Sequence, residues 1–237
     1  QESLWKRPID GAVFLDGETV VSGFPVGLTL DLGRLPSPYL NGLMDPFLDD
    51  GFMPMVQTSR LCPYTCTFCV SGKNRGKLRA FPLDQVKEEL RFIAKHFADR
   101  SHLMLTISDE NFGIIERDEE IADYILECSK TYSYPLSLFF YNDKKFLKTS
   151  RNIMAKVGHM VSNGLTLSLQ TDSPEALKAI NRKNLSDDVL REGISWAASI
   201  NLQTTTELIF GLPEETKESF VSALSTAVDR GFDAVMC

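Results

Sequence analysis

Three cysteines close together are the residues of this chain most able to do chemistry. Cys62, Cys66 and Cys69 lie within eight residues of one another, with the spacing C-x3-C-x2-C. Cysteine thiolates hold iron–sulfur clusters, and a cluster that only carries electrons uses four of them. Three thiols would leave one iron without a protein ligand, and catalytic metal sites keep such an open position. The loop therefore predicts a [4Fe–4S] cluster with one free coordination position.

Two other interpretations of this loop stay open from the residues alone. The thiols could be buried and act as small hydrophobes, although the polar Thr65 and Thr67 between them disfavour this. The loop could also belong to a non-catalytic iron–sulfur or zinc-binding module. A structural zinc site needs four ligands, so a distant fourth residue would have to join: His96, His102, His159, Cys128 or Cys237.

The elements that must position this loop alternate between strands and helices. Short apolar runs predict strands at residues 53–58, 103–107, 136–141, 165–169, 204–210 and 232–236. Helical spacing of apolar residues predicts helices at residues 86–97, 118–130, 153–161 and 220–228, with further helices starting near residues 173 and 186. Such alternation implies parallel strands covered by helices, with ligands at the carboxyl ends of the strands. The cysteine loop follows the first strand, so we expect it at that end.

Composition excludes several classes of protein. The chain has 237 residues, 43% of them hydrophobic and 24% charged, and no apolar run long enough to span a membrane. Its net charge of −7 argues against a nucleic-acid surface. The five cysteines are odd in number and clustered, which disfavours a secreted disulfide framework. We therefore expect a reducing, cytoplasmic location.

The first fifty residues differ in composition from the rest of the chain. Residues 1–50 are rich in Gly, Pro and Asp and are expected to be an irregular extension or linker, with a stiff Leu-Pro-Ser-Pro-Tyr-Leu segment at residues 35–40. Residues 51–237 are expected to be the core domain. The chain starts at Gln1 and ends at Cys237, just after the start of a strand, which suggests a fragment whose core is incomplete at its C-terminus.

With Phe68 before the last cysteine, the loop resembles the C-x3-C-x-aromatic-C signature of the radical S-adenosylmethionine (SAM) superfamily. The resemblance extends over residues 51–237. It implies an α/β fold, a partial (β/α)6 radical SAM barrel truncated at the sixth strand, with an irregular N-terminal extension. Cys62, Cys66 and Cys69 would be the metal ligands, and Phe68 would lie beside the cofactor. The resemblance assigns no catalytic side chain.

Two polar segments resemble the SAM-binding motifs of the same family. Ser108-Asp109-Glu110-Asn111 stands where the family has a Gly-Gly-Glu-like motif, which implies that Glu110 contacts the methionine amino group of SAM. Ser168 and Gln170 stand on the strand whose polar side chains meet the ribose and the methionine carboxylate. Read by themselves, Glu110 could cap the following helix, and Gln170 could be a polar residue satisfied at a strand end.

A third segment resembles the family's adenine-binding strand. Residues 207–214, Glu-Leu-Ile-Phe-Gly-Leu-Pro-Glu, match G-x-I-x-G-x-x-E except that Glu207 replaces the first Gly. The match implies that Ile209 and Gly211 lie against the adenine. Without the family, Gly211 is equally well a turn glycine. The basic run Lys73, Arg75, Lys77 and Arg79 after the cysteines is expected to be a solvated loop; the alternative is a positive wall for a SAM carboxylate or an anionic substrate.

The N-terminal segment resembles the connector of radical SAM enzymes that carry a cobalamin-binding domain, because residues 35–40 are followed by Met-Asp-Pro-Phe-Leu at 44–48. Residues 1–50 would then be the tail of such a domain, and cobalamin a cofactor of the full-length protein. The resemblance implies reductive cleavage of SAM to methionine and a 5′-deoxyadenosyl radical, or methyl transfer through cobalt. It also implies a small-molecule substrate and an electron donor such as flavodoxin or ferredoxin.

Overall fold

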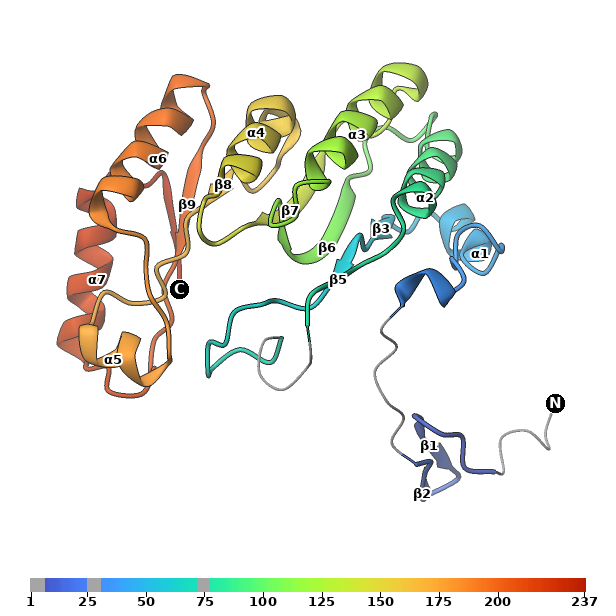
Figure 1. Ribbon diagram of the computed structural model, residues 1–237, viewed down its shortest axis with the longest axis horizontal. Helices are drawn as coiled ribbons and strands as arrows, with labels where there is room; N and C mark the ends of the chain where they lie inside the picture. The colour runs from blue at the N-terminus through green and yellow to red at the C-terminus, as the bar shows by residue number, and fades with distance from the viewer. Residues whose placement is uncertain (1–6, 25–30, 72–76) are drawn as a thin grey trace. The chain divides into compact units, whose positions relative to one another are not determined.

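The computed structural model describes residues 7–24, 31–71 and 77–237, in two compact units that divide between Asp31 and Leu32 (Figure 1). In the first unit, β1 (Val13–Asp16) pairs antiparallel with β2 (Thr19–Ser22), and Gly17 in the turn has φ +62°. The expectation of an irregular extension is wrong here. The two loop residues are Gly17 and Glu18, and a Gly at the first loop position supplies the positive φ of a tight hairpin turn.

Residues 32–50 lie in the same compact unit as residues 51–237. They contain a 3-10 turn, η1 (Leu32–Arg34), and a short helix, α1 (Asp45–Asp49). The buried Tyr39 hydroxyl donates to the Met55 carbonyl at 2.6 Å and accepts from the Met55 N–H at 3.0 Å. This segment is therefore fixed to the first strand of the second unit. The division into an extension at 1–50 and a core at 51–237 stays a prediction.

Two three-stranded parallel sheets form the centre of the second unit. One has the order β3-β6-β7, from β3 (Met55–Val56), β6 (Leu105–Phe112) and β7 (Leu138–Asn142). The other has the order β10-β9-β8, from β8 (Leu165–Thr166), β9 (Thr204–Glu207) and β10 (Ala234–Met236). A small antiparallel pair, β4 (Ser59–Arg60) with β5 (Arg79–Ala80), flanks the cysteine loop.

Helices alternate with these strands, as the sequence predicts. They are α2 (Leu83–His96), α3 (Asp118–Tyr132), α4 (Lys148–Val157), α5 (Pro174–Ala179), α6 (Asp187–Ser199) and α7 (Lys217–Asp229). Side-chain oxygens of Ser173, Ser186 and Thr216 cap the last three, each satisfying an N–H that has no partner within the helix. Within the described part of the chain, no helix is both long and apolar enough to cross a bilayer.

The predicted helix at 153–161 ends earlier than expected. Helix α4 stops at Val157 and continues as a 3-10 turn, η2 (Gly158–Met160). Val161 instead forms a parallel bridge with Leu138, and the Ser162 N–H donates to the Leu138 carbonyl at 2.8 Å. Residue 161 therefore starts the next strand segment rather than finishing the helix.

Asparagine side chains join the two sheets at β7 and β8. The Asn142 amide donates to the Thr166 carbonyl and accepts from the Thr166 N–H, both at 3.0 Å. The Asn163 amide donates to the Phe140 carbonyl at 3.0 Å. Together with the Leu138–Val161 bridge, these amides take the place of a continuous backbone ladder.

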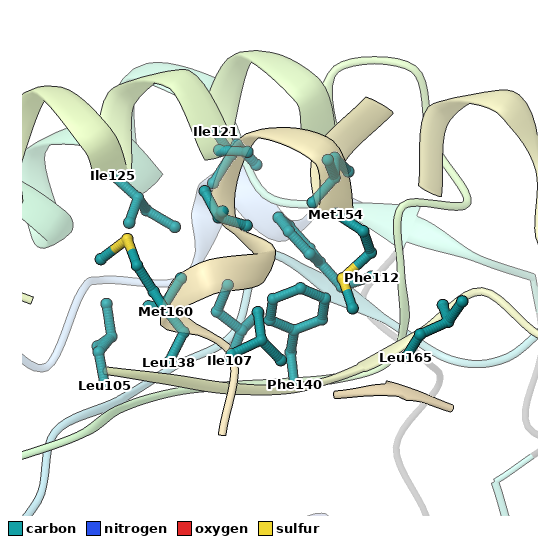
Figure 2. Packing of buried hydrophobic residues seen from close by; sticks show 14 of the residues in the cluster. Leu105, Ile107, Phe112, Ile121, Ile125, Leu138, Phe140, Met154, Met160 and Leu165 are labelled. Carbon is teal, nitrogen blue, oxygen red and sulfur yellow. The ribbon is translucent and has the colours of Figure 1, made fainter. Parts of the chain in front are cut away.

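The hydrophobic core lies between the two sheets and the helices that cover them. Over the first sheet these helices are α2, α3 and α4, which stand side by side (Figure 1). Ile121 and Ile125 from α3 and Met154 from α4 point toward the strands, as Figure 2 shows. Phe112 and Phe140 pack edge to face beneath them, with ring centroids 5.1 Å apart. Each such side chain contributes about 1.5–3 kcal/mol when fully buried, so this layer holds the strand ends in fixed positions.

Candidate functional site

The cysteine loop leaves β4 at Arg60, and Leu61 turns the chain with φ 78°. Cys62 and Cys66 are buried, with 7% and 9% of their surface exposed, and Cys69 is half-buried. All three are free thiols. The loop therefore presents three sulfur atoms that are not joined in a disulfide.

Each of the three sulfur atoms accepts a hydrogen bond from a different N–H donor. The Asn111 side chain donates to Cys62 Sγ at 3.0 Å, and Arg182 Nη1 lies 3.8 Å from Cys66 Sγ. The Ser71 backbone N–H donates to Cys69 Sγ at 3.4 Å. Burial raises the pKa of the Cys62 thiol, and hydrogen bonds from the Tyr64 backbone and the Asn111 side chain oppose that rise. Donors of this kind stabilise thiolates and tune the metal groups that thiolates hold.

Buried polar contacts fix the chain immediately before the loop. Asp109, at the buried face of β6, accepts from the Thr58 N–H at 2.7 Å, from the Thr58 hydroxyl at 2.6 Å and from the Ser59 hydroxyl at 2.7 Å. Burial raises the pKa of this carboxyl group. Arg117, at the start of α3, donates to the Thr58 carbonyl at 2.8 Å. The start of the loop is thus fixed from the second strand of its sheet.

Two further regions hold the loop itself. The Tyr64 hydroxyl donates to the fully buried Asp143, just after β7, at 2.9 Å. The Asn181 amide, after α5, donates to the Thr65 hydroxyl at 2.7 Å. The Thr67 N–H donates to the Ile180 carbonyl at 3.0 Å. The loop therefore spans the carboxyl ends of strands from both sheets.

The described residues contain no group of three or more His, Cys, Asp or Glu side chains arranged to hold a metal ion. The assignment of Cys62, Cys66 and Cys69 as cluster ligands therefore stays a prediction. Their chemistry fits an iron–sulfur cluster, because they are soft sulfur donors on one loop and each sulfur faces an N–H group. Two of the candidates for a fourth zinc ligand have other surroundings: Cys128 is in the hydrophobic core, and His96 packs against Phe92 and Phe97.

Two polar side chains from the segment after β8 meet the carboxylate of Glu207 in β9. Ser168 Oγ donates to Glu207 Oε2 at 2.7 Å, and Gln170 Nε2 lies 3.4 Å from the same oxygen. Gln170 is buried, has φ 69°, and bonds through its backbone to Glu207 and Ile209. In the sequence, Glu207 stood out only as a departure from a glycine motif. The structure makes it the residue on which the two predicted SAM contacts meet.

Glu110 carries a buried carboxylate oxygen with no partner. It lies inside strand β6, so it does not cap the following helix, whose N-cap position is Arg117. Glu110 Oε2 is buried without a hydrogen bond among the described residues. A buried oxygen without a partner costs free energy unless a ligand or water satisfies it, so this atom fits the ammonium group that the resemblance assigns to it.

The remaining predicted cofactor residues are less enclosed. The Ile209 N–H donates to the Gln170 carbonyl at 2.8 Å and its side chain is half-buried. Gly211 lies in an exposed turn with φ +86°, and Phe68 is 38% exposed. The structure therefore brings Ile209 to the Ser168–Glu207 group and leaves Phe68 and Gly211 at the surface. Of the basic run after the cysteines, Lys73 and Arg75 lie outside the described residues.

The sequence of this chain is similar to several enzymes of one family. A profile described as the radical SAM superfamily matches residues 56–227. The cobalamin-dependent radical SAM methyltransferase TokK of Streptomyces tokunonensis is 35% identical over 208 residues, which are 83% of this chain and 29% of that protein. The 2-(S-pantetheinyl)-carbapenam-3-carboxylate methyltransferase of Streptantibioticus cattleyicolor is 32% identical over 94% of this chain and 33% of that protein. The chain thus spans about a third of the length of these relatives.

Solved structures share the fold. The radical SAM methyltransferase TsrM from Kitasatospora setae aligns with a TM-score of 0.66, over 96% of this chain and 45% of that chain, at 17% identity. The cobalamin-dependent radical SAM enzyme OxsB aligns with a TM-score of 0.63, over 92% of this chain and 32% of that chain, at 16% identity. At such identities the likeness shows the fold alone, which is α/β.

Proposed function

This chain belongs to the radical SAM superfamily, and we propose that it is part of a cobalamin-dependent radical SAM methyltransferase. The two relatives described above, at 35% and 32% identity, are methyltransferases, and one is described as cobalamin-dependent. The observation that carries the proposal is the cysteine loop: three free thiols on one loop, each with an N–H group donating to its sulfur. These features support a catalytic radical SAM centre over a non-catalytic iron–sulfur or zinc module.

The two parallel sheets are the two halves of an open (β/α)6 barrel. In this arrangement β3, β6 and β7 are its first three strands, and β8, β9 and β10 are the next three. On β6 and β9, half-buried side chains alternate with buried ones. Glu110 and Glu207 are on this half-buried side, which is therefore the face where cofactor and substrate would bind.

Cys62, Cys66 and Cys69 are the proposed ligands of a [4Fe–4S] cluster. Asn111 and Arg182 would donate hydrogen bonds to two of the ligand sulfurs, since they already do so to Cys62 and Cys66. Hydrogen bonds to cluster sulfurs are a principal control of reduction potential. Arg182 also donates to the Ser168 carbonyl, so one guanidinium links the cluster loop to the neighbouring SAM-binding segment.

Glu110, Ser168 and Gln170 are the proposed polar contacts of SAM, with Ile209, Gly211 and Phe68 beside its adenosyl part. Bound together, the cluster and SAM supply a one-electron cleavage of a carbon–sulfur bond that yields a 5′-deoxyadenosyl radical. Around them this chain orients SAM through the Glu110 carboxylate, whose Oε2 has no partner among the described residues. The covering helices exclude water from one side of the site.

Cobalamin and the substrate belong to the parent protein as a whole. We expect residues 1–50 to follow a cobalamin-binding domain, and residues 51–237 to form the radical SAM core. The substrate is expected to be a small molecule, the electron donor a flavodoxin or ferredoxin, and the location cytoplasmic, because free clustered thiols need a reducing compartment.

Anaerobic reconstitution tests this function. The protein is supplied with iron and sulfide, and bound iron, acid-labile sulfide and the visible spectrum are measured. After reduction in the presence of SAM, 5′-deoxyadenosine is quantified. We expect four irons per chain and 5′-deoxyadenosine from the wild type. A colourless protein that retains zinc would instead establish the non-catalytic module.

Two cysteine substitutions complete the test. Cys66→Ala should abolish cluster retention, because it removes one of three ligands. Cys237→Ala, at an exposed thiol outside the loop, should leave iron content unchanged. Equal iron in both variants would contradict the ligand assignment.

A further inference from the structure

A pocket of about 210 Å³ lies against the cysteine loop. Its walls come from Tyr64 and Cys66 in the loop, Lys144 and Lys145 after β7, and Arg182 and Lys183 after α5. No described strand residue lines it. None of Glu110, Ser168 and Glu207, where SAM is proposed to bind, lines the pocket. The pocket adjoins that group through Arg182, which also donates to the Ser168 carbonyl.

The pocket is strongly basic in an acidic chain. Four of its lining side chains are cationic and none is acidic, although the chain as a whole carries a net charge of −7. Lys178 lies in an adjoining hollow that shares Asn181, Arg182 and Lys183 with the pocket. We call Lys144, Lys145, Lys178, Arg182 and Lys183 the basic pocket surface.

The cations of this surface are not used in ion pairs. Elsewhere Lys87, Lys156 and Arg230 pair with carboxylates. Among the described residues, no member of the basic pocket surface makes such a pair. Asp143 lies nearby but is fully buried, and its oxygens accept from Tyr64 and from the backbone of residues 145 and 147. Uncompensated charge of one sign at a surface attracts a partner of opposite charge.

The size of the pocket limits what can occupy it. Sites for drug-sized ligands measure about 300–1,000 Å³, so the pocket by itself, at 210 Å³, is small for a complete substrate. The adjoining hollow, of about 680 Å³, widens the surface on which a protein can dock. It is large enough for one or two acidic side chains of a protein. Cys66 forms part of its wall, so such a protein would touch the loop that is proposed to hold the cluster.

We propose that the basic pocket surface is the docking site of an acidic protein that carries a one-electron centre. This inference rests on the proposed function, which requires an external electron. With a flavodoxin, the anionic flavin hydroquinone would lose one electron and become the neutral semiquinone without proton transfer, and that electron would pass to the cluster through the loop that the carrier touches. Carboxylates of the carrier would pair with Lys145 and Lys183, which both line the pocket and are exposed.

Binding of an oxidised, acidic flavodoxin to the reconstituted chain tests the docking site without any turnover. The wild type is expected to bind at low salt and to lose affinity as salt is added. Lys145→Glu with Lys183→Glu should weaken binding by at least about tenfold. The matched control is Lys130→Glu with Lys217→Glu, which changes net charge equally at exposed positions outside the pocket and should stay within about twofold of the wild type.

Reduction rates provide the second measurement. Flavodoxin hydroquinone should reduce the cluster of the pocket variant more slowly than that of the control, whereas dithionite should reduce both equally. The docking proposal is wrong if the wild type does not bind flavodoxin, or if the pocket variant and the control lose affinity equally. If flavodoxin binds as expected but SAM yields no 5′-deoxyadenosine, the proposed function fails and the docking site stands.

Discussion

Ser168 Oγ donates a hydrogen bond to Glu207 Oε2 at 2.7 Å, across the boundary between the segment after β8 and strand β9. Gln170 Nε2 lies 3.4 Å from the same oxygen. Glu207 stands where the superfamily motif has a glycine, so the carboxylate occupies space that a glycine would leave open. Glu207 is therefore placed to orient both polar side chains that are proposed to contact SAM.

Glu207→Ala is expected to weaken SAM binding by about tenfold, because Ser168 and Gln170 lose their common acceptor. Glu207→Gln keeps an acceptor oxygen and should weaken binding less. Equilibrium dialysis of SAM with the reconstituted variants measures both affinities, and circular dichroism verifies the fold. Wild-type affinity in the alanine variant would exclude this orienting role.

Asn111→Leu removes the side-chain donor to Cys62 Sγ and is expected to lower the reduction potential of the bound cluster. A hydrogen bond to a ligand sulfur stabilises the added negative charge of the reduced cluster, so its loss favours the oxidised form. A potentiometric titration followed by electron paramagnetic resonance gives the potential. Ser71→Ala is the control, because the backbone N–H of residue 71 is the donor to Cys69. An unchanged potential in Asn111→Leu would contradict the role of this bond.

Asp109→Asn should destabilise the fold by about 2–3 kcal/mol. Asp109 accepts three hydrogen bonds from Thr58 and Ser59, and an amide offers only one accepting oxygen. The matched variant Asp123→Asn removes an exposed carboxylate that pairs with Lys156 and should cost less than about 1 kcal/mol. Urea denaturation of both proteins measures the difference. Similar midpoints would show that Asp109 does not fix the start of the loop.

Stability should depend on the ionisation of Asp118. Burial raises the pKa of this carboxyl group from 3.8 to about 6. Between these two values the unfolded chain has lost the proton and the folded chain retains it, so the contribution of this group to stability falls as pH rises from about 4 to about 6 and stays constant above. This rise in pKa corresponds to a loss of roughly 3 kcal/mol, at most, in the free energy of unfolding.

Asp118→Asn tests this pH dependence. The amide does not ionise, and its oxygen can still accept from the Gly113 and Ile115 N–H groups that now bond to Asp118. Relative to the wild type, the variant should gain stability as pH rises from 4.5 to 7, as measured by urea denaturation at each pH. Parallel curves for the two proteins over this range would contradict the raised pKa.

The order of elements could be predicted from the sequence because local signals determine it. Ser173-Pro174-Glu175 predicted the start of α5, and Ser173 caps that helix. The end of the β8 segment could not be predicted in the same way. The Thr206 hydroxyl donates to the Leu167 carbonyl at 2.9 Å and approaches the Leu169 N–H at 3.3 Å, so a side chain of the neighbouring strand replaces part of the expected ladder.

The cysteine loop could be found from its spacing, but its surroundings could not. Arg182 reaches Cys66 across 116 positions of sequence, and Asn111 reaches Cys62 across 49. No local pattern reports which polar side chain will face a given sulfur, since this depends on how β6 and the turn after α5 meet the loop. Lys144, Lys145 and Lys183 likewise appear in the sequence as ordinary solvated charges, and only the fold gathers them into one pocket.

The junction between β7 and β8 has a consequence for engineering the fold. Asn142 and Asn163 hold the two sheets together where main-chain pairing is reduced to a single bridge. The side-chain amides of Asn142 and Asn163 therefore help to set the angle at which one sheet meets the other. Substitutions at these positions could widen or narrow the opening between the halves while every strand keeps its own register.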